Sequence, residues 1–197
     1  MPGSSLSSPD AEDKRPPGRL IVIAGPGGVG KSTIVAEVRH RVPVHFSVSA
    51  TTRSQRPAEV QGFHYRFVDK EQFEHLIESG ELLEWAMFNG NYYGTPRDAV
   101  EAARAEGRDV LLEIEVQGAR QIRAAMPEAL MIFVAPPSMD DLRRRLEARA
   151  DTSPADIDAK LLIAEEEMAA APVLFDHIVL NDDVDRAVDE VVDILTR

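Results

Sequence analysis

The feature that most constrains this chain is a glycine-rich segment close to its N-terminus. The segment matches the pattern G-x-x-x-x-G-K-[ST] at every required position, as Gly25-Pro26-Gly27-Gly28-Val29-Gly30-Lys31-Ser32. In this pattern the glycines let backbone N–H groups turn inward around phosphate oxygens, and the following helix adds the partial positive charge of its N-terminus. The lysine reaches the β- and γ-phosphates, and the serine hydroxyl is a ligand of Mg²⁺. The motif therefore predicts a site for a nucleoside triphosphate, with Lys31 and Ser32 in these two roles.

The sequence around this phosphate-binding loop (P-loop, residues 25–32) has the order that the mechanism needs. The apolar run 20–24 suits a buried strand of a parallel sheet, and Ile34, Val35 and Val38 give the next segment a helical apolar face. A chance glycine-rich turn, which is the alternative, has no need of a strand before it and a helix after it. We therefore expect nucleotide contacts along the whole loop and from Thr33 just beyond it.

Apolar runs alternate with amphipathic segments along the rest of the chain. We expect buried strands over residues 20–24, 44–48, 110–115, 130–134 and 178–180. Helices are expected between them, one begun by Thr95-Pro96, one capped by Ser138, and one running from Ser153-Pro154 to Pro172. This alternation predicts an α/β fold with a doubly wound, parallel, five-stranded sheet.

Residues 49–94 differ in character because they are rich in aromatic side chains. Residues 64–68 have the alternation of a strand, and Asp69 with Gln72 forms the pattern of a capping box at the start of a helix. The segment is predicted to be an inserted α+β subdomain. We assign four of its aromatic side chains to a core: Phe63, Phe67, Phe73 and Trp85.

The charge balance excludes several classes of partner. Lys and Arg total 22 against 34 Asp and Glu, so the net charge is −12. A surface this acidic argues against nucleic-acid and anionic-membrane binding, so any positive charge for a phosphate must be local. No apolar run is long enough to span a bilayer, and residues 1–18 have the composition of a disordered tail rather than a secretory signal. The absence of cysteine excludes disulfides and fits a reducing cytoplasm.

Two longer motifs lie downstream of the P-loop. Residues 47–53 read S-V-S-A-T-T-R, and residues 90–95 read G-N-Y-Y-G-T. With the P-loop, these runs resemble guanylate kinase, and the resemblance covers nearly the whole chain from Arg19 onward. It implies a P-loop nucleoside-monophosphate kinase fold, with GMP bound by the inserted segment and ATP covered by a helical lid.

The resemblance also implies which side chains contact GMP. Those expected at its phosphate are Ser49, Arg53, Arg56, Tyr65 and Tyr93, and those expected at guanine are Glu84, Thr95 and Glu115. The chemistry agrees, because two arginines can hold a dianionic phosphate from two sides and tyrosine hydroxyls can donate to it. One carboxylate can accept both the N1–H and the 2-amino donors of guanine, a pairing that adenine does not offer. Arg53 and Arg56 could instead be solvated surface charges, and Thr95 could be only a helix cap.

The same resemblance divides the chain into three parts. The lid is expected at about residues 139–159 and the GMP-binding segment over residues 49–95. The core is expected to comprise residues 19–48, 96–138 and 160–197. Arg145, Arg149 and Lys160 align with lid positions that contact phosphate, and Asn181 lies where the family contacts adenine. Arg143 and Arg144 complete the local cluster of cations. The alternative for this cluster is a solvated helix face paired with the nearby acidic side chains.

Several positions depart from the family pattern. These are Gly27, Gln55, Ala58, Glu113, Glu115, Ala148, Ala150 and Lys160, none of which removes the P-loop lysine, the arginine pair or Glu84. They leave open a related kinase with a different phosphorylated acceptor. A non-catalytic binding module on the same scaffold is also possible, although Lys31 and Ser32 argue against it.

The expected reaction is reversible, Mg²⁺-dependent transfer from ATP to GMP, and also to dGMP, giving ADP and the nucleoside diphosphate. The attacking group is a phosphate monoester, whose second pKa is about 6, so it is already largely dianionic at neutral pH. No general base is therefore expected. Catalysis should come from positioning and charge stabilisation by Lys31, Arg145, Arg149 and Lys160. The sequence gives no indication of oligomeric state.

Overall fold

The main sheet of the protein carries the P-loop at its centre. A computed structural model describes residues 16–88, 90–148 and 154–197. Its main sheet is parallel throughout, which confirms the predicted doubly wound α/β fold. The strands, in spatial order, are β2 (His45–Phe46), β7 (Val110–Glu113), β1 (Leu20–Ala24), β8 (Leu130–Ala135) and β9 (His177–Leu180).

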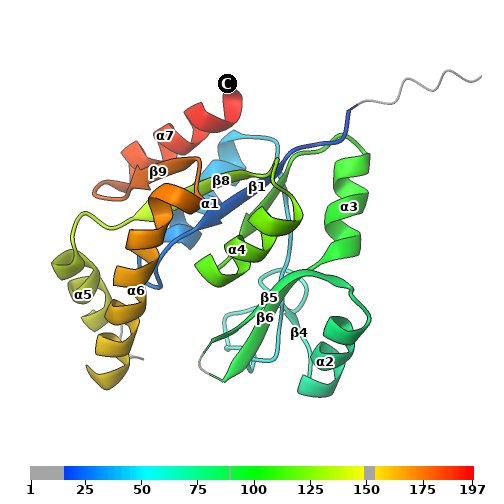
Figure 1. The fold of residues 1–197 in the computed structure, drawn as a ribbon, viewed down its shortest axis with the longest axis horizontal. Helices are drawn as coiled ribbons and strands as arrows, with labels where there is room; N and C mark the ends of the chain where they lie inside the picture. The colour runs from blue at the N-terminus through cyan, green and yellow to red at the C-terminus, as the bar shows by residue number, and fades with distance from the viewer. Residues whose placement is uncertain (1–15, 89, 149–153) are drawn as a thin grey trace, which may run out of the picture.

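Helices cover both faces of this sheet (Figure 1). The helices on one face are α3 (Arg97–Ala105), α4 (Val116–Ala125) and α6 (Pro154–Leu174), and those on the other face are α1 (Lys31–Arg41) and α7 (Val184–Thr196). The strand β1 shows why its sequence is continuously apolar: Leu20 and Val22 enter one core, whereas Ile21 and Ile23 enter the other. The covered sheet is a rigid support for the loops at its edge.

A second, smaller sheet accounts for the aromatic-rich segment. Its strands, in spatial order, are β4 (Arg66–Phe67), β3 (Ala50–Thr51), β6 (Asn91–Pro96) and β5 (Leu82–Phe88), and α2 (Lys70–Glu78) packs with them. Phe73 is fully buried and stacks on Tyr92, with 5.2 Å between the ring centroids. The expected capping box is present, because Asp69 accepts from the backbone of Gln72 and Gln72 accepts from the backbone of Asp69.

The helix α5 (Met139–Glu147) follows β8 and lies beside the P-loop, where its Leu142 and Leu146 approach Gly28. Ser138 caps it as expected, accepting a hydrogen bond from the backbone N–H of Asp141. Its buried side chains Leu142 and Leu146 form a small core with Ile157 and Leu161 of α6. No helix in the described part of the chain combines the length and the hydropathy needed to cross a membrane.

Several local expectations were wrong. Thr95 does not cap a helix: it lies in β6, and α3 has Pro96 at its N-cap position. The strand expected over residues 110–115 ends at Glu113, and the helix expected to end by Pro172 continues to Leu174. Phe63 is not a core side chain, because 61% of its surface is exposed. Of the expected tail, residues 1–15 lie outside the described residues, whereas Gly18 is buried and its N–H donates to Arg104.

Candidate nucleotide-binding site

The P-loop joins the central strand β1 to the N-terminus of α1. Gly28 and Gly30 have φ values of 91° and 102°, which residues with a Cβ rarely adopt. Gly30 is the N-cap residue of α1, and it has no side chain that could accept from the first N–H groups of the helix. The first turn also lacks an acidic residue. The positive end of this helix is therefore available to an anion such as a phosphate.

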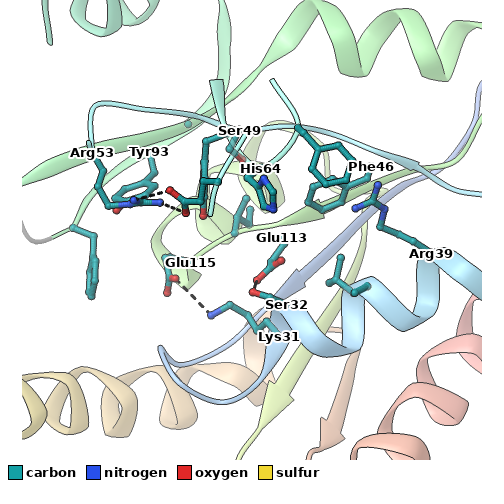
Figure 2. Close-up of a pocket in the computed structure, with 18 of the residues that line it drawn as sticks. Lys31, Ser32, Arg39, Phe46, Ser49, Arg53, His64, Tyr93, Glu113 and Glu115 are labelled. Carbon is teal, nitrogen blue, oxygen red and sulfur yellow. Dashed lines mark hydrogen bonds and ion pairs between the residues drawn. The ribbon is translucent and has the colours of Figure 1, made fainter. Parts of the chain in front are cut away.

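Lys31 projects into the loop that it follows. Its side chain is 8% exposed, and its Nζ donates to the carbonyl oxygens of Gly25 at 2.5 Å and Pro26 at 3.3 Å. Glu115 Oε1 lies 3.5 Å from the same nitrogen (Figure 2). The ammonium group is thus held among oxygen atoms, in the position where the phosphates of a bound nucleotide would supply further oxygens.

Ser32 donates a hydrogen bond to Glu113, with 2.6 Å between Oγ and Oε1 (Figure 2). Burial raises the pKa of the Glu113 carboxyl, while the Ser32 hydrogen bond and Lys31 lower it. A hydroxyl beside a carboxylate fits Mg²⁺, which usually takes one or two carboxylates together with substrate phosphates and water. The described residues contain no group of three or more His, Cys, Asp and Glu that could hold a metal alone, so phosphate oxygens would have to complete the coordination.

Glu113 was missing from the predicted contacts. Its partner Ser32 is distant in sequence, and the two meet because β7 pairs with β1, with Glu113 opposite Ile23. The sequence feature that could have identified Glu113 is a carboxylate at the end of a predicted strand. This feature is informative only if that strand is known to lie beside the strand that leads into the P-loop, and the sequence does not give the order of strands.

A cavity of about 780 Å³ lies between the P-loop and the second sheet. Figure 2 shows side chains from both parts pointing into it. The predicted residues that line it are Lys31, Ser32, Ser49, Arg53, Arg56, Tyr65, Glu84, Tyr93 and Glu115. The lining also includes Arg39, Phe46 and His64, which were not predicted. The fold therefore brings the triphosphate loop and most of the expected GMP contacts to one space.

Glu59 organises the arginine-bearing loop on the second sheet. Its two carboxylate oxygens accept from Arg53 at 2.6 and 3.0 Å, and one also accepts from the backbone N–H of Arg56 at 2.8 Å. The Glu59 hydrogen bond raises the pKa of Arg53, whose guanidinium lies over the Tyr65 ring. Burial raises the pKa of Tyr65 to about 12, so its hydroxyl stays protonated and able to donate. Arg53 is thus a positioned cation, whereas Arg56 is exposed.

Glu84 is the most deeply buried carboxylate of the cavity. It is 4% exposed, and its Oε1 accepts from the Thr95 hydroxyl at 2.7 Å. Burial, with a smaller contribution from Glu115, raises the pKa of Glu84 to about 7, although the hydrogen bonds from Thr95 lower it. A buried carboxylate with one neutral donor still has capacity for further donors.

The lid residues lie apart from this cavity. Arg145 donates to the carbonyl oxygens of Val29 at 2.9 Å and of Asn181 at 2.7 Å. The Asn181 side chain, 1% exposed, also donates to Val29, at 2.7 Å, and its buried Oδ1 has no hydrogen-bond partner among the described residues. Arg149 lies outside the described residues, and Lys160 is on α6. Asn181 and Arg145 therefore support the back of the P-loop in this structure.

Comparison with known proteins agrees with this geometry. The guanylate kinase family model matches residues 17–197. This chain belongs to the guanylate kinase family. It is 53% identical to the guanylate kinase of Streptomyces coelicolor over 91% of this chain and 90% of that one. It is 46% identical to that of Synechococcus sp. (strain JA-3-3Ab), over 95% of this chain and 91% of the other. The crystal structure of guanylate kinase from Anaplasma phagocytophilum superposes with a TM-score of 0.77 at 33% identity, covering 92% of this chain and 86% of that chain.

Two further features complete this guanylate kinase site. A Cβ at Gly27 would meet no described heavy atom within 4 Å, so the loop has room for a side chain at this position. Glu167 of α6 was not predicted, because it stands in a run of glutamates without a motif. Burial, followed by the nearby Glu115, raises its pKa to about 7, while Lys31 and Arg120 lower it. The neighbourhood of Lys31 therefore holds more carboxylates than the motif alone indicates.

Proposed function

We propose that this chain catalyses reversible, Mg²⁺-dependent transfer of the γ-phosphate of ATP to GMP, and also to dGMP, giving ADP and GDP or dGDP. The observation that carries the proposal is the Glu84–Thr95 pair: Glu84 lines the same cavity as Lys31 and Arg53, and its carboxylate accepts from the fully buried hydroxyl of Thr95 behind it. Membership of the guanylate kinase family supports the same reaction.

In this proposal the acceptor is held at both of its ends. Glu84, once deprotonated, accepts from the N1–H and the 2-amino group of guanine. When guanine is bound to Glu84, the Thr95 hydroxyl donates to the O6 carbonyl of the base instead of to Glu84. Glu115, the third predicted guanine contact, lies beside Lys31 and is close enough to Glu84 to raise its pKa. The GMP phosphate is held by the remaining predicted contacts, which are Ser49, Arg53, Arg56, Tyr65 and Tyr93.

The donor is held by the P-loop. Its backbone N–H groups and Lys31 would bind the phosphates of ATP, and Asn181 would keep the loop in place from behind. Ser32 and Glu113 would hold Mg²⁺, which supplies charge neutralisation of the phosphate oxygens when it is bound. Arg145, Arg149 and Lys160 would add positive charge as the lid closes. The GMP phosphate is itself the nucleophile, so no side chain has to remove a proton.

We also propose how the chain is divided into segments and in which compartment the enzyme acts. The core comprises residues 19–48, 96–138 and 160–197, the GMP-binding segment residues 49–95, and the lid about residues 139–159. A chain without cysteine fits a reducing cytoplasm. A net charge of −12 disfavours nucleic acid as a partner, so small anionic substrates would be bound by local clusters of positive charge.

The test is coupled ADP release with ATP and Mg²⁺, comparing GMP, dGMP, AMP, UMP and CMP as acceptors. Turnover is expected with GMP and dGMP only. Lys31→Ala is expected to abolish it, because the substitution removes the cation at the transferred phosphate. No turnover with any of the five would refute the proposal, and turnover with another acceptor would assign the chain to a different substrate.

A further inference from the structure

The helix α4 packs against β5, the strand that carries Glu84 (Figure 1). One side chain of α4 bonds the backbone of the next residue, Trp85. Gln121 Oε1 accepts from the Trp85 N–H at 3.2 Å, and Gln121 Nε2 donates to the Trp85 carbonyl at 2.6 Å. Since β5 is the outer strand of the second sheet, the Gln121 amide supplies a donor and an acceptor as a further strand would.

One turn earlier on the same helix, Gly118 faces the Glu84 carboxylate. A Cβ at Gly118 would lie 2.1 Å from Glu84 Oε2 and 2.9 Å from its Cδ, distances that no real side chain tolerates. Glycine in a helix interior is destabilising relative to alanine, so its place in α4 needs a reason. The Glu84 carboxylate occupies the space that a side chain would fill, and this supplies the reason.

We propose that Gln121 and Gly118 are positioning residues for guanine recognition: Gln121 fixes the backbone of β5 beside Glu84, and Gly118 leaves room for its carboxylate. The two lie three positions apart and so share one face of α4. The inference rests on the proposed function, because it assigns Glu84 to the guanine base. Neither residue contacts the substrate, and both act through Glu84.

The geometry of base recognition makes this positioning necessary. Guanine presents two donors side by side, so two carboxylate oxygens meet both only in one orientation. In this structure the Thr95 hydroxyl orients Oε1, and the space over Gly118 receives Oε2. Once the Thr95 hydroxyl turns to guanine O6, the position of β5 against α4 and the space over Gly118 are the constraints that remain on the carboxylate. If β5 moves away from α4, the carboxylate loses one of these constraints and the pairing with the 2-amino group is misaligned.

The test compares GMP with inosine monophosphate, which has the same ring except that the 2-amino group is missing. In Gln121→Met the side chain keeps its length but loses both bonds to Trp85. The ratio of kcat/KM for GMP to that for inosine monophosphate is expected to fall about tenfold, which corresponds to the loss of one well-placed hydrogen bond. The KM for ATP should be unchanged. If Gln121 had a merely structural role, the substitution would lower kcat/KM equally for both acceptors and leave the ratio unchanged.

Three further variants sharpen the result. Gln117→Met is the matched control, since Gln117 is an exposed glutamine one turn earlier on α4, and its ratio should equal that of the wild type. Gln121→Glu retains an acceptor for Trp85 N–H but sets a second acceptor against the Trp85 carbonyl, and should lower the ratio at least as far as Gln121→Met. Gly118→Ala places a Cβ in the space that the Glu84 carboxylate occupies, so it displaces the carboxylate directly and should also lower the ratio. If one variant does not fold, the others still decide.

An unchanged ratio in the folded Gln121 and Gly118 variants would overturn the inference. That outcome is distinct from failure of the proposed function, which would appear as absence of GMP turnover in the wild-type enzyme. Wild-type turnover of GMP with no preference over inosine monophosphate would also overturn the inference, because no 2-amino recognition would then exist for α4 to support.

Discussion

At the scale of single residues, the proposed role of Glu84 makes acceptor binding depend on the charge of its carboxyl group. Burial raises its pKa to about 7 in the nucleotide-free enzyme, whereas the pairing with guanine requires the anion. Below the pKa, GMP binding must be accompanied by loss of a proton. We therefore expect the KM for GMP to fall as pH rises through 7, with a slope approaching tenfold per pH unit on the acid side. Initial rates between pH 6 and pH 8.5 measure it.

The GMP phosphate itself loses a proton near pH 6, so its titration must be separated from that of Glu84. Glu84→Gln provides the separation, because it cannot titrate and should show only the phosphate contribution, at a higher KM. The KM for ATP serves as an internal reference. Identical pH profiles in the variant and the wild type would show that Glu84 does not set the dependence.

A second residue-scale prediction concerns Glu113. Its bond to Ser32 places a carboxylate beside the P-loop hydroxyl, although burial raises the pKa of the carboxyl. Glu113→Gln keeps the hydrogen bond but removes the negative charge. The Mg²⁺ concentration that gives half-maximal activity should rise about 10–100-fold, the usual effect of removing a residue that supports a metal ligand.

The control for this prediction is Glu165→Gln, an exposed glutamate on α6. Its Mg²⁺ dependence should match that of the wild type. If the Glu113 variant also keeps the wild-type Mg²⁺ requirement while losing kcat, then Glu113 acts through Lys31 or the fold rather than through the metal.

At the scale of elements, α5 is attached to the P-loop through Arg145. Among the described residues its hydrogen bonds go to the carbonyl oxygens of Val29 and Asn181, which use two of its five N–H donors and leave the others for a phosphate. Arg145→Ala is expected to lower kcat about 10³-fold, the smaller end of the effect of a transition-state arginine, with little change in the KM for GMP. Steady-state kinetics with both substrates varied gives the two constants.

Arg144→Ala is the matched control for Arg145, since it removes the neighbouring guanidinium, which is exposed and paired with Asp141. Surface pairs of this kind contribute little, so its kcat should remain near that of the wild type. Equal losses in the two variants would mean that α5 contributes only diffuse positive charge.

The elements also show which parts of the fold the sequence could predict. The strands β1 and β8 were predictable because both of their faces are buried and their sequences are continuously apolar. Thr95-Pro96 misled because this dipeptide has the local chemistry of a helix start, whereas pairing of Thr95 with Glu84 across β5 and β6 keeps it in a strand. Local preference was overridden there by a contact that depends on the tertiary fold.

The residues of the candidate site likewise include some that the sequence could predict and some that it could not. The P-loop and Arg53 belong to contiguous motifs whose chemistry is complete within a few residues, so the sequence was sufficient to find them. The Ser32–Glu113 and Trp85–Gln121 bonds join residues far apart in the chain. Their partners are fixed by the order of strands and by the packing of α4, which a single sequence does not specify.

At the scale of the whole molecule, two bodies face each other across the cavity. In the proposed function the P-loop side binds the ATP phosphates and the second sheet binds the base and the phosphate of GMP, with a cavity of about 780 Å³ between them. Phosphoryl transfer to GMP rather than to water requires that solvent be excluded from this space. Phe63, one of the side chains that line this space, is exposed to solvent.

Binding of both nucleotides should therefore close the molecule by a hinge motion. With GMP and a non-hydrolysable ATP analogue together, the radius of gyration from small-angle X-ray scattering should decrease relative to the free protein. Replacing GMP with AMP should prevent most of the decrease, because adenine does not offer Glu84 the paired donors that hold the second sheet over the P-loop. If the radius is the same in all three samples, the open cavity is already the catalytic form, and water must instead be excluded by the substrates themselves.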